Sequence, residues 1–382
     1  MSSQIIEILN VTRETAWLPW AVQYFFLIGL SYGSFLLTLP YFVFGRIQHE
    51  RLGRLALLGA LVCGLTAPVA LLADLHGPGR FYNFYLHFQP QSWMSWGSFF
   101  IPLYLGGLTL YAWLSLRGDF AKRGLAGDSW GVRAYRLVGR GGAVSRRAIV
   151  AAASVTLAGA VLVALYTGME VMVVQARPLW NTPFLPPQFA MTALVGAIGL
   201  LLLLNRLIGR RDTQVEINLN RLLALALAGV LALGGGWLFT SLSGLSPSHS
   251  AAFNQVAGMA SWQITAVWAV LAAAVPMVLA VWRPASSGLM TGLIAVHSAW
   301  MMRWTILIGG QDIPKTGAGL YDYHLPLGSN GLLGIVGTFG LWIALLLLMI
   351  EYLPWAGSVP GSHSGRTTQA THAVADGAIA QH

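Results

Sequence analysis

Long continuous apolar runs recur along most of the chain, and they constrain its fold more than any other feature. An α-helix needs about 20 apolar residues to cross the hydrocarbon core of a bilayer. A membrane-spanning β-strand would instead alternate apolar and polar residues over about ten positions. We therefore predict an all-α integral membrane protein, a polytopic helical bundle of about nine transmembrane helices. The predicted spans cover residues 20–44, 55–75, 97–116, 148–169, 189–208, 222–242, 262–282, 288–308 and 332–352.

The composition agrees with a chain that lies mostly in lipid. Hydrophobic residues make up 56% of the chain and charged residues only 9%, whereas a soluble domain carries about 25% charged residues. The formal net charge is +9, which in a soluble protein would suggest nucleic acid as a partner. Here the basic residues gather in a few loops between apolar runs. We therefore expect the lipid membrane as a partner and no nucleic acid.

Lysine and arginine are distributed unevenly between the two sets of loops. Most follow the first, third, fifth and seventh predicted spans. Because cytoplasmic loops are enriched in Lys and Arg, we predict an N-terminus outside and a C-terminus in the cytoplasm, with the chain multi-pass in the cell inner (cytoplasmic) membrane. Residues 1–355 would form a single transmembrane domain. Residues 356–382, rich in Ser, Gly, Ala, Thr and His, are expected to be a disordered cytoplasmic tail.

The chain has few residues suited to ligating a metal or a cluster. Its one cysteine, Cys63, lies in an apolar run, whereas an iron–sulfur cluster needs about four thiolates. A haem held by two histidines would need a second buried histidine beside His297. The other histidines ahead of the tail fall in predicted loops or at a helix end. We expect no haem, no iron–sulfur cluster and no metal site in this chain.

Polar residues with a possible function gather near the outer ends of the predicted spans. Asp74 and His76 end the second span, where a carboxylate is costly unless it is hydrated or paired. Together they could accept protons, or each could be a solvated residue at a helix end. In the eighth span, Arg303 is an intramembrane charge, which by default suggests a functional site, and we predict that it belongs to the cofactor-binding residues. Its long side chain could also snorkel to the surface.

A second polar group lies at the end of the fourth span and just beyond it. Helical spacing would place Tyr166, Glu170, Val173 and Arg177 on one face. Glu170 and Arg177 would lie roughly 10 Å apart at 1.5 Å per residue, too far for a direct ion pair, but both could meet Asp74 across the gap between helices. The structural interpretation is a salt bridge that holds helices together. The functional interpretation is the wall of a quinone pocket near the outer surface.

The outer loop between the second and third spans is rich in aromatic residues. Trp and Tyr favour the membrane interface, where one end of the ring is apolar and the other is wet. An aromatic belt and a platform on which a partner subunit docks are both compatible with this pattern. The residues concerned are Phe81, Tyr82, Phe84, Tyr85, Trp93 and Trp96.

Several segments together resemble a known family. The sequence Trp-Leu-Pro-Trp-Ala-Val-Gln-Tyr-Phe-Phe at 17–26 resembles the start of the NrfD-like membrane subunits of the polysulfide reductase type. Segments 73–76, 92–97 and 166–180 match the same family in order, and segments 302–308 and 337–345 strengthen the likeness. The resemblance covers residues 17–352, and within the family it is greatest to the membrane subunits of tetrathionate-reducing complexes.

The resemblance implies a function that the composition alone does not give. Such subunits anchor an extracytoplasmic complex of a molybdopterin catalytic subunit and a four-cluster iron–sulfur subunit. They oxidise a membrane quinol, menaquinol or ubiquinol, and pass the electrons outward. By position, the quinol site would include Gln23, Asp74, His76 and Tyr166.

The resemblance also implies a role for each residue of that site. Tyr166 or His76 would form a hydrogen bond with a quinol oxygen, and Asp74 would accept or relay a proton. Glu170 and Arg177 would fix the charge balance. The chain itself would be either a quinol-dehydrogenating subunit or a non-catalytic subunit of an oxidoreductase.

Other functions keep the fold and change the chemistry. The terminal acceptor could be polysulfide, thiosulfate or arsenate, or electrons could run inward from sulfite to quinone. A secondary transporter would be expected to carry broken helices and polar groups at the midplane, whereas the polar residues here gather at the outer edge. A purely structural anchor without a quinone site is the remaining alternative.

Overall fold

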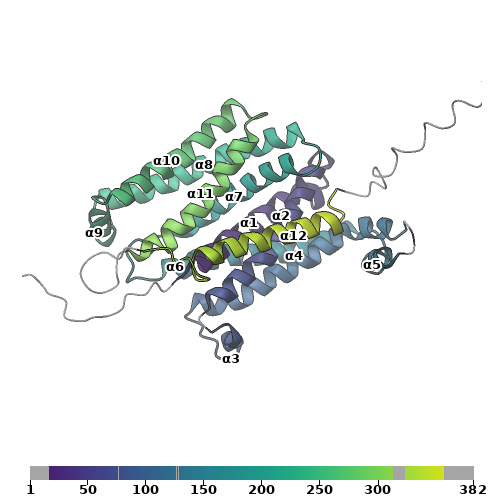
Figure 1. Ribbon diagram of the computed structural model, residues 1–382, viewed down its shortest axis with the longest axis horizontal. Coiled ribbons are helices and arrows are strands. Elements are labelled where there is room, and N and C mark those ends of the chain that lie inside the picture. The colour runs from purple at the N-terminus through teal and green to yellow at the C-terminus, as the bar shows by residue number, and fades with distance from the viewer. Residues whose placement is uncertain (1–16, 76, 126, 128, 313–322, 357–382) are drawn as a thin grey trace, which may run out of the picture.

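The computed structural model describes residues 17–75, 77–125, 127, 129–312 and 323–356. Within these ranges every regular element is a helix, and the long helices lie side by side in one bundle (Figure 1). The long helices are α1 Pro19–Phe42, α2 Glu50–Asp74, α4 Trp93–Arg123, α6 Arg146–Met172, α7 Leu185–Leu207, α8 Thr213–Leu242, α10 Ala260–Trp282, α11 Gly288–Leu307 and α12 Leu332–Tyr352. Shorter helices are α3 Asn83–Leu86, α5 Trp130–Val138 and α9 Pro247–Val256.

Eight helices of the described chain are long and apolar enough to cross a membrane. The prediction of an all-α integral membrane protein is therefore confirmed. Helix α11, with 20 residues and thus about 30 Å long, is not among the eight because its polar residues lower its apolarity. It packs against α7, α10 and α1 inside the bundle, so a ninth span stays a prediction. The predicted tail lies outside the described residues, apart from residue 356.

The two ends of the bundle differ. Helices α3 and α9 lie at one end, which we call the α3 end, and α5 lies at the other, which we call the basic end (Figure 1). At the basic end the carboxylate of Glu216 is fully buried and is bound by Arg206 at 2.6 Å and Arg211 at 2.8 Å. The backbone N–H of Gly288 also donates to it at 2.7 Å. This network joins α7, α8 and the start of α11.

Several helices are longer than the predicted spans. Helix α8 begins at Thr213 rather than at residue 222 because Asp212 caps it by accepting from the N–H groups of Gln214 and Val215. Helix α4 has 31 residues and extends past both ends of the predicted span 97–116. Apolar runs report only the part of a helix that lies in hydrocarbon. Charged residues at the headgroup level end the run without ending the helix.

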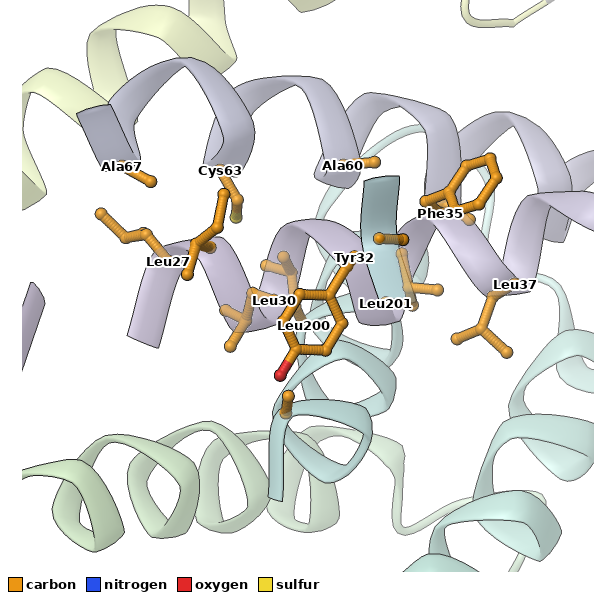
Figure 2. Close-up of a cluster of buried hydrophobic side chains, with 14 of the residues drawn as sticks. Leu27, Leu30, Tyr32, Phe35, Leu37, Ala60, Cys63, Ala67, Leu200 and Leu201 are labelled. Carbon is orange, nitrogen blue, oxygen red and sulfur yellow. The ribbon is translucent and has the colours of Figure 1, made fainter. Parts of the chain in front are cut away.

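Helix α1 lies in the core of the bundle. Figure 2 shows its side chains meeting Ala60, Cys63 and Ala67 of α2 and Leu200 and Leu201 of α7 in one cluster. Small residues such as Ala60 and Ala67 let these helices approach closely. This is usual in membranes, where the hydrophobic effect does not drive helices together. Because other helices surround α1, cavities can form between α1 and its neighbours on more than one side.

Candidate functional site

A cavity of about 370 Å³ opens at the α3 end of the bundle, between α1, α2, α4 and α6. Most of its wall is apolar or aromatic, and it includes two prolines inside helices, Pro68 and Pro102. Two carboxylates and the hydroxyl-bearing rings of two buried tyrosines interrupt this wall. These polar lining residues are Asp74, Glu170, Tyr24 and Tyr166. The structure thus gathers Asp74, Tyr166 and Glu170, three of the residues predicted from the sequence.

Asp74 links the cavity to the start of α1. It is the last residue of α2, and its Oδ1 accepts a hydrogen bond from the backbone N–H of Leu18 at 3.3 Å. The first N–H groups of a helix have no partner within the helix, and a negative charge there is favourable. The neighbouring Trp17 exchanges hydrogen bonds with the side chain of Gln311, at 3.3 and 3.1 Å. The α1 start is therefore held from two sides.

Glu170 presents an oxygen that has no partner. The side chain is 8% exposed, and its Oε2 accepts no hydrogen bond from the residues that the structure describes. The hydroxyl of Tyr24 is equally without a partner in the described ranges. Glu170 lies within electrostatic range of Asp74 and Tyr166. Buried polar atoms are nearly always hydrogen-bonded, so this pair of orphaned atoms fits a ligand that carries polar oxygens.

The ring of Tyr166 rests against Gly97 of α4. A Cβ atom at position 97 would lie 2.5 Å from two ring carbons of Tyr166, closer than real Cβ contacts. The ring itself is 2% exposed, so it has little room to move. The missing side chain of Gly97 therefore sets how closely α4 and α6 approach at the cavity.

We expect Gly97→Ala to lower both the amount of folded protein and its thermal stability. Overpacking of a filled site typically costs about 1–3 kcal/mol, and relief of the clash would displace Tyr166. Gly106→Ala is the matched control, because a Cβ there meets nothing within 4 Å. Both variants are quantified by the level of detergent-extracted protein and by its unfolding temperature. Equal behaviour of the two variants would contradict this role of Gly97.

The structure separates Arg177 from the cavity. Helix α6 ends at Met172, so the prediction that Val173 and Arg177 continue the face of Tyr166 was wrong: helical spacing does not apply beyond the helix end. Arg177 is buried in the following turn, donates to the carbonyl oxygen of Gln311 at 3.3 Å and lies over the ring of Trp180. Burial lowers the pKa of its guanidinium from the usual value. Its role in charge balance stays a prediction.

Arg303 lies in the core of the helix bundle rather than at its surface. Its side chain is 1% exposed, so it does not snorkel. It donates to the carbonyl oxygen of Phe189 at 2.7 Å and to the hydroxyl of Thr192. These bonds tie α11 to α7. Arg303 does not line the cavity, and the predicted contact with a quinol stays untested.

The remaining predicted residues have different outcomes. His76 lies outside the described residues. Gln23 lines a separate groove on another face of α1. Tyr24, which the residue-by-residue prediction omitted, lines the cavity instead. The signal for Tyr24 was its place in the segment 17–26, but an apolar helix buried on many sides does not reveal which face meets a cavity.

The aromatic loop contributes to the cavity and to its rim. Phe81, Phe84 and Tyr85 line the cavity. Tyr82 and Trp96 lie outside it and are 48% and 39% exposed. Part of the predicted belt is thus the wall of a pocket, and the exposed part remains available at the α3 end.

Comparisons with known proteins show what this chain is similar to. The family model described as "Polysulphide reductase, NrfD" matches residues 8–315. The chain is 34% identical over 359 residues to a tetrathionate reductase subunit of Salmonella typhimurium, covering 91% of this chain and 95% of that protein. It is 36% identical over 121 residues to a selenate reductase subunit of Mesobacillus selenatarsenatis, covering 32% of this chain and 28% of that protein. An Hdr-like menaquinol oxidoreductase integral membrane subunit of Archaeoglobus fulgidus is 26% identical over 245 residues, covering 62% of this chain and 54% of that protein.

Proposed function

The chain belongs to the NrfD (polysulphide reductase) family, and on that premise we propose that it is the quinol-oxidising membrane subunit of an extracytoplasmic molybdopterin oxidoreductase complex. Electrons pass from the quinol to an iron–sulfur subunit on the outer face and from there to the molybdopterin subunit. The observation that carries the proposal is the cavity at the α3 end, in which Asp74 and Glu170 meet two tyrosines.

The cavity suits a quinol headgroup. Its volume of about 370 Å³ falls in the usual range for ligand pockets, about 300–1,000 Å³. Apolar and aromatic side chains would contact the ring. Oxidation of a quinol to a quinone releases two electrons and two protons, so the site needs proton acceptors beside an electron acceptor. The chain supplies carboxylates for the protons, while the electrons go to the partner subunit.

The polar residues have distinct tasks in this proposal. The hydroxyls of Tyr24 and Tyr166 orient the quinol oxygens. The free Oε2 of Glu170 and the carboxylate of Asp74 accept the protons. Asp74 lies nearer the α3 end, because it is the last residue of its helix, and it passes protons outward.

The acceptor that we propose is tetrathionate. The support is the relative named as part of a tetrathionate reductase, which aligns over 95% of its length. The relative named for selenate reductase aligns over 28% of its length. The relative named as a menaquinol oxidoreductase subunit supports menaquinol as the donor. Polysulfide, thiosulfate, arsenate and selenate are the other acceptors that the test includes.

The test isolates the full chain with the subunits that co-purify with it. We expect a molybdopterin protein and an iron–sulfur protein among them. A reduced menaquinone analogue should then drive tetrathionate reduction faster than reduction of the other acceptors. If the complex reduces tetrathionate with electrons from a reduced dye but not with electrons from the quinol, the chain is only a structural anchor.

Topology follows from the same proposal. We expect alkaline phosphatase fused after Pro90 or after Leu327 to be active, and fusions after Gly127 or after Ala285 to be inactive, because the Lys and Arg residues favour the cytoplasm. The pair at 285 and 327 brackets α11 and tests whether it spans. Fusion protein levels are matched by immunoblot. An active fusion after Gly127 would place the proposed partners on the wrong side, and equal activity at 285 and 327 would remove α11 as a ninth span.

A further inference from the structure

A second space opens on another face of α1, away from the carboxylates. It is a groove of about 370 Å³ between α1, α7, α11 and α12. Leu207 and Phe339 line it and are 73% and 60% exposed, so it opens to the lipid around the bundle. We propose that this groove binds a phospholipid of the outer leaflet, whose acyl chain fills it and whose ester carbonyl accepts a hydrogen bond from Gln23.

Gln23 supplies the polar anchor of the groove. Its side chain is 6% exposed, and its Nε2 is buried without a hydrogen-bond partner among the residues described. An amide donor left unsatisfied in an apolar medium costs several kcal/mol. No water is expected in the hydrocarbon to relieve this cost. An amphiphile that brings a carbonyl oxygen to Gln23 would satisfy the donor.

The other polar side chains of the groove are already engaged. The hydroxyl of Thr338 donates to the carbonyl oxygen of Gly334 at 2.8 Å, and the indole N–H of Trp342 points to the sulfur of Cys63 at 3.3 Å. The side chains lining the groove include no acid, base or tyrosine. A quinol oxidised here would find no proton acceptor, so the groove suits an amphiphile that does not react.

The depth of Gln23 fits an ester linkage. Helix α1 has 24 residues and is about 36 Å long, which exceeds the hydrocarbon core of about 30 Å. Gln23 follows Pro19 by four residues, so it lies about 6 Å along the helix. A centred helix would put Gln23 about 3 Å inside the hydrocarbon boundary, next to the ester groups. The assignment to the outer leaflet rests on the topology proposed above.

The acyl chain would complete the packing of α12. Within that helix only Gly334 and Thr338 are buried, and Phe339, which lines the groove, is 60% exposed. The match to the family model ends at residue 315, ahead of α12. The proposed lipid site therefore depends on an element that the family match does not include.

The experiment uses the full chain with its co-purifying subunits in nanodiscs that contain a phosphatidylcholine with a diazirine at the end of one acyl chain. After photolysis, we expect label on segments 200–208 and 338–346. Gln23→Leu should reduce that label about three- to tenfold, the range expected for one hydrogen bond in a membrane. Leu346→Trp, which fills the groove, should reduce it further.

Two matched variants control for general effects. Gln188→Leu removes another buried amide, on α7, that does not line the groove. Leu347→Trp adds the same ring to a neighbouring position that is 61% exposed and outside the groove. Both should keep the label. Equal label on the lipid faces of α8 and α10, or equal loss in test and control variants, would overturn the proposal.

A third arm separates this site from the quinol site. Excess menaquinone should leave the lipid label in the groove unchanged. If it removes the label, the occupant is a quinone and the proposal of a phospholipid is wrong. Quinol-driven turnover of Leu346→Trp tests the cavity at Asp74 separately, so each proposal can fail without the other.

Discussion

Replacing Asp74 with asparagine should lower quinol-driven turnover by about 10²–10⁴-fold, the usual contribution of a general base. Asparagine keeps an oxygen for the N–H of Leu18, which donates to Asp74 at 3.3 Å. The start of α1 should therefore stay in place while the proton acceptor is lost. The measurement compares turnover driven by a menaquinol analogue with turnover driven by a reduced dye that bypasses this subunit.

The control removes a carboxylate at the other end of the bundle. Asp119 binds Arg54 at 2.7 Å, and Arg54 retains Glu50 as a partner. Asp119→Asn should therefore change quinol-driven turnover per folded subunit far less than Asp74→Asn. If Asp74→Asn abolishes dye-driven activity as well, Asp74 has a structural role. If quinol-driven turnover does not change, Asp74 takes no part in the reaction.

Replacing Glu216 with glutamine should destabilise the folded chain by about 3 kcal/mol, the low end of the cost of breaking a buried ion pair. Glutamine keeps the size of the side chain but leaves Arg206 and Arg211 without the charge that both contact. The low end applies because the side chain of Arg211 is 37% exposed and can partly turn to water or lipid headgroups. Thermal unfolding of the detergent-purified complex measures the loss.

Glu50→Gln is the matched control for this prediction. Its side chain is 45% exposed and its partner Arg54 also binds Asp119. Exposed pairs contribute about 0–1 kcal/mol, so the control should lose little stability. Similar unfolding temperatures for the two variants would show that the Glu216 network does not hold α7, α8 and α11 together.

The helices were readable from the sequence because lipid leaves the backbone few alternatives. Their ends were not, because charges at the headgroup level interrupt an apolar run but not a helix. Helix α8 shows this most clearly: Glu216 lies inside the helix, and its charge is neutralised by Arg206 and Arg211. A hydropathy average counts each of these charges as a separate penalty and does not register that they neutralise one another.

The site was partly predictable for a related reason. Asp74 and Glu170 were expected to meet because each is a carboxylate near the same end of a predicted span, and the structure places both at one cavity. The sequence did not show which of Gln23 and Tyr24 faces the cavity. Adjacent residues of a helix point about 100° apart, and α1 is apolar on all sides, so no apolar face marks the side that packs against the bundle. The prediction placed Arg177 on the same helix face as Tyr166, but helix α6 ends at Met172, so helical spacing does not extend to Arg177.

The contact between Gly97 and Tyr166 gives the cavity an asymmetric tolerance to genetic change. Its apolar walls can lose or exchange atoms, as at Leu72, which is 41% exposed. Position 97 has no side-chain atom to lose, and any replacement adds a carbon where only 2.5 Å is available. A survey that only shortens side chains would leave this position out, because glycine has no side chain to shorten. The spacing of α4 and α6 at the cavity is thus set by a residue without a side chain, and only mutations that add atoms at position 97 can test this.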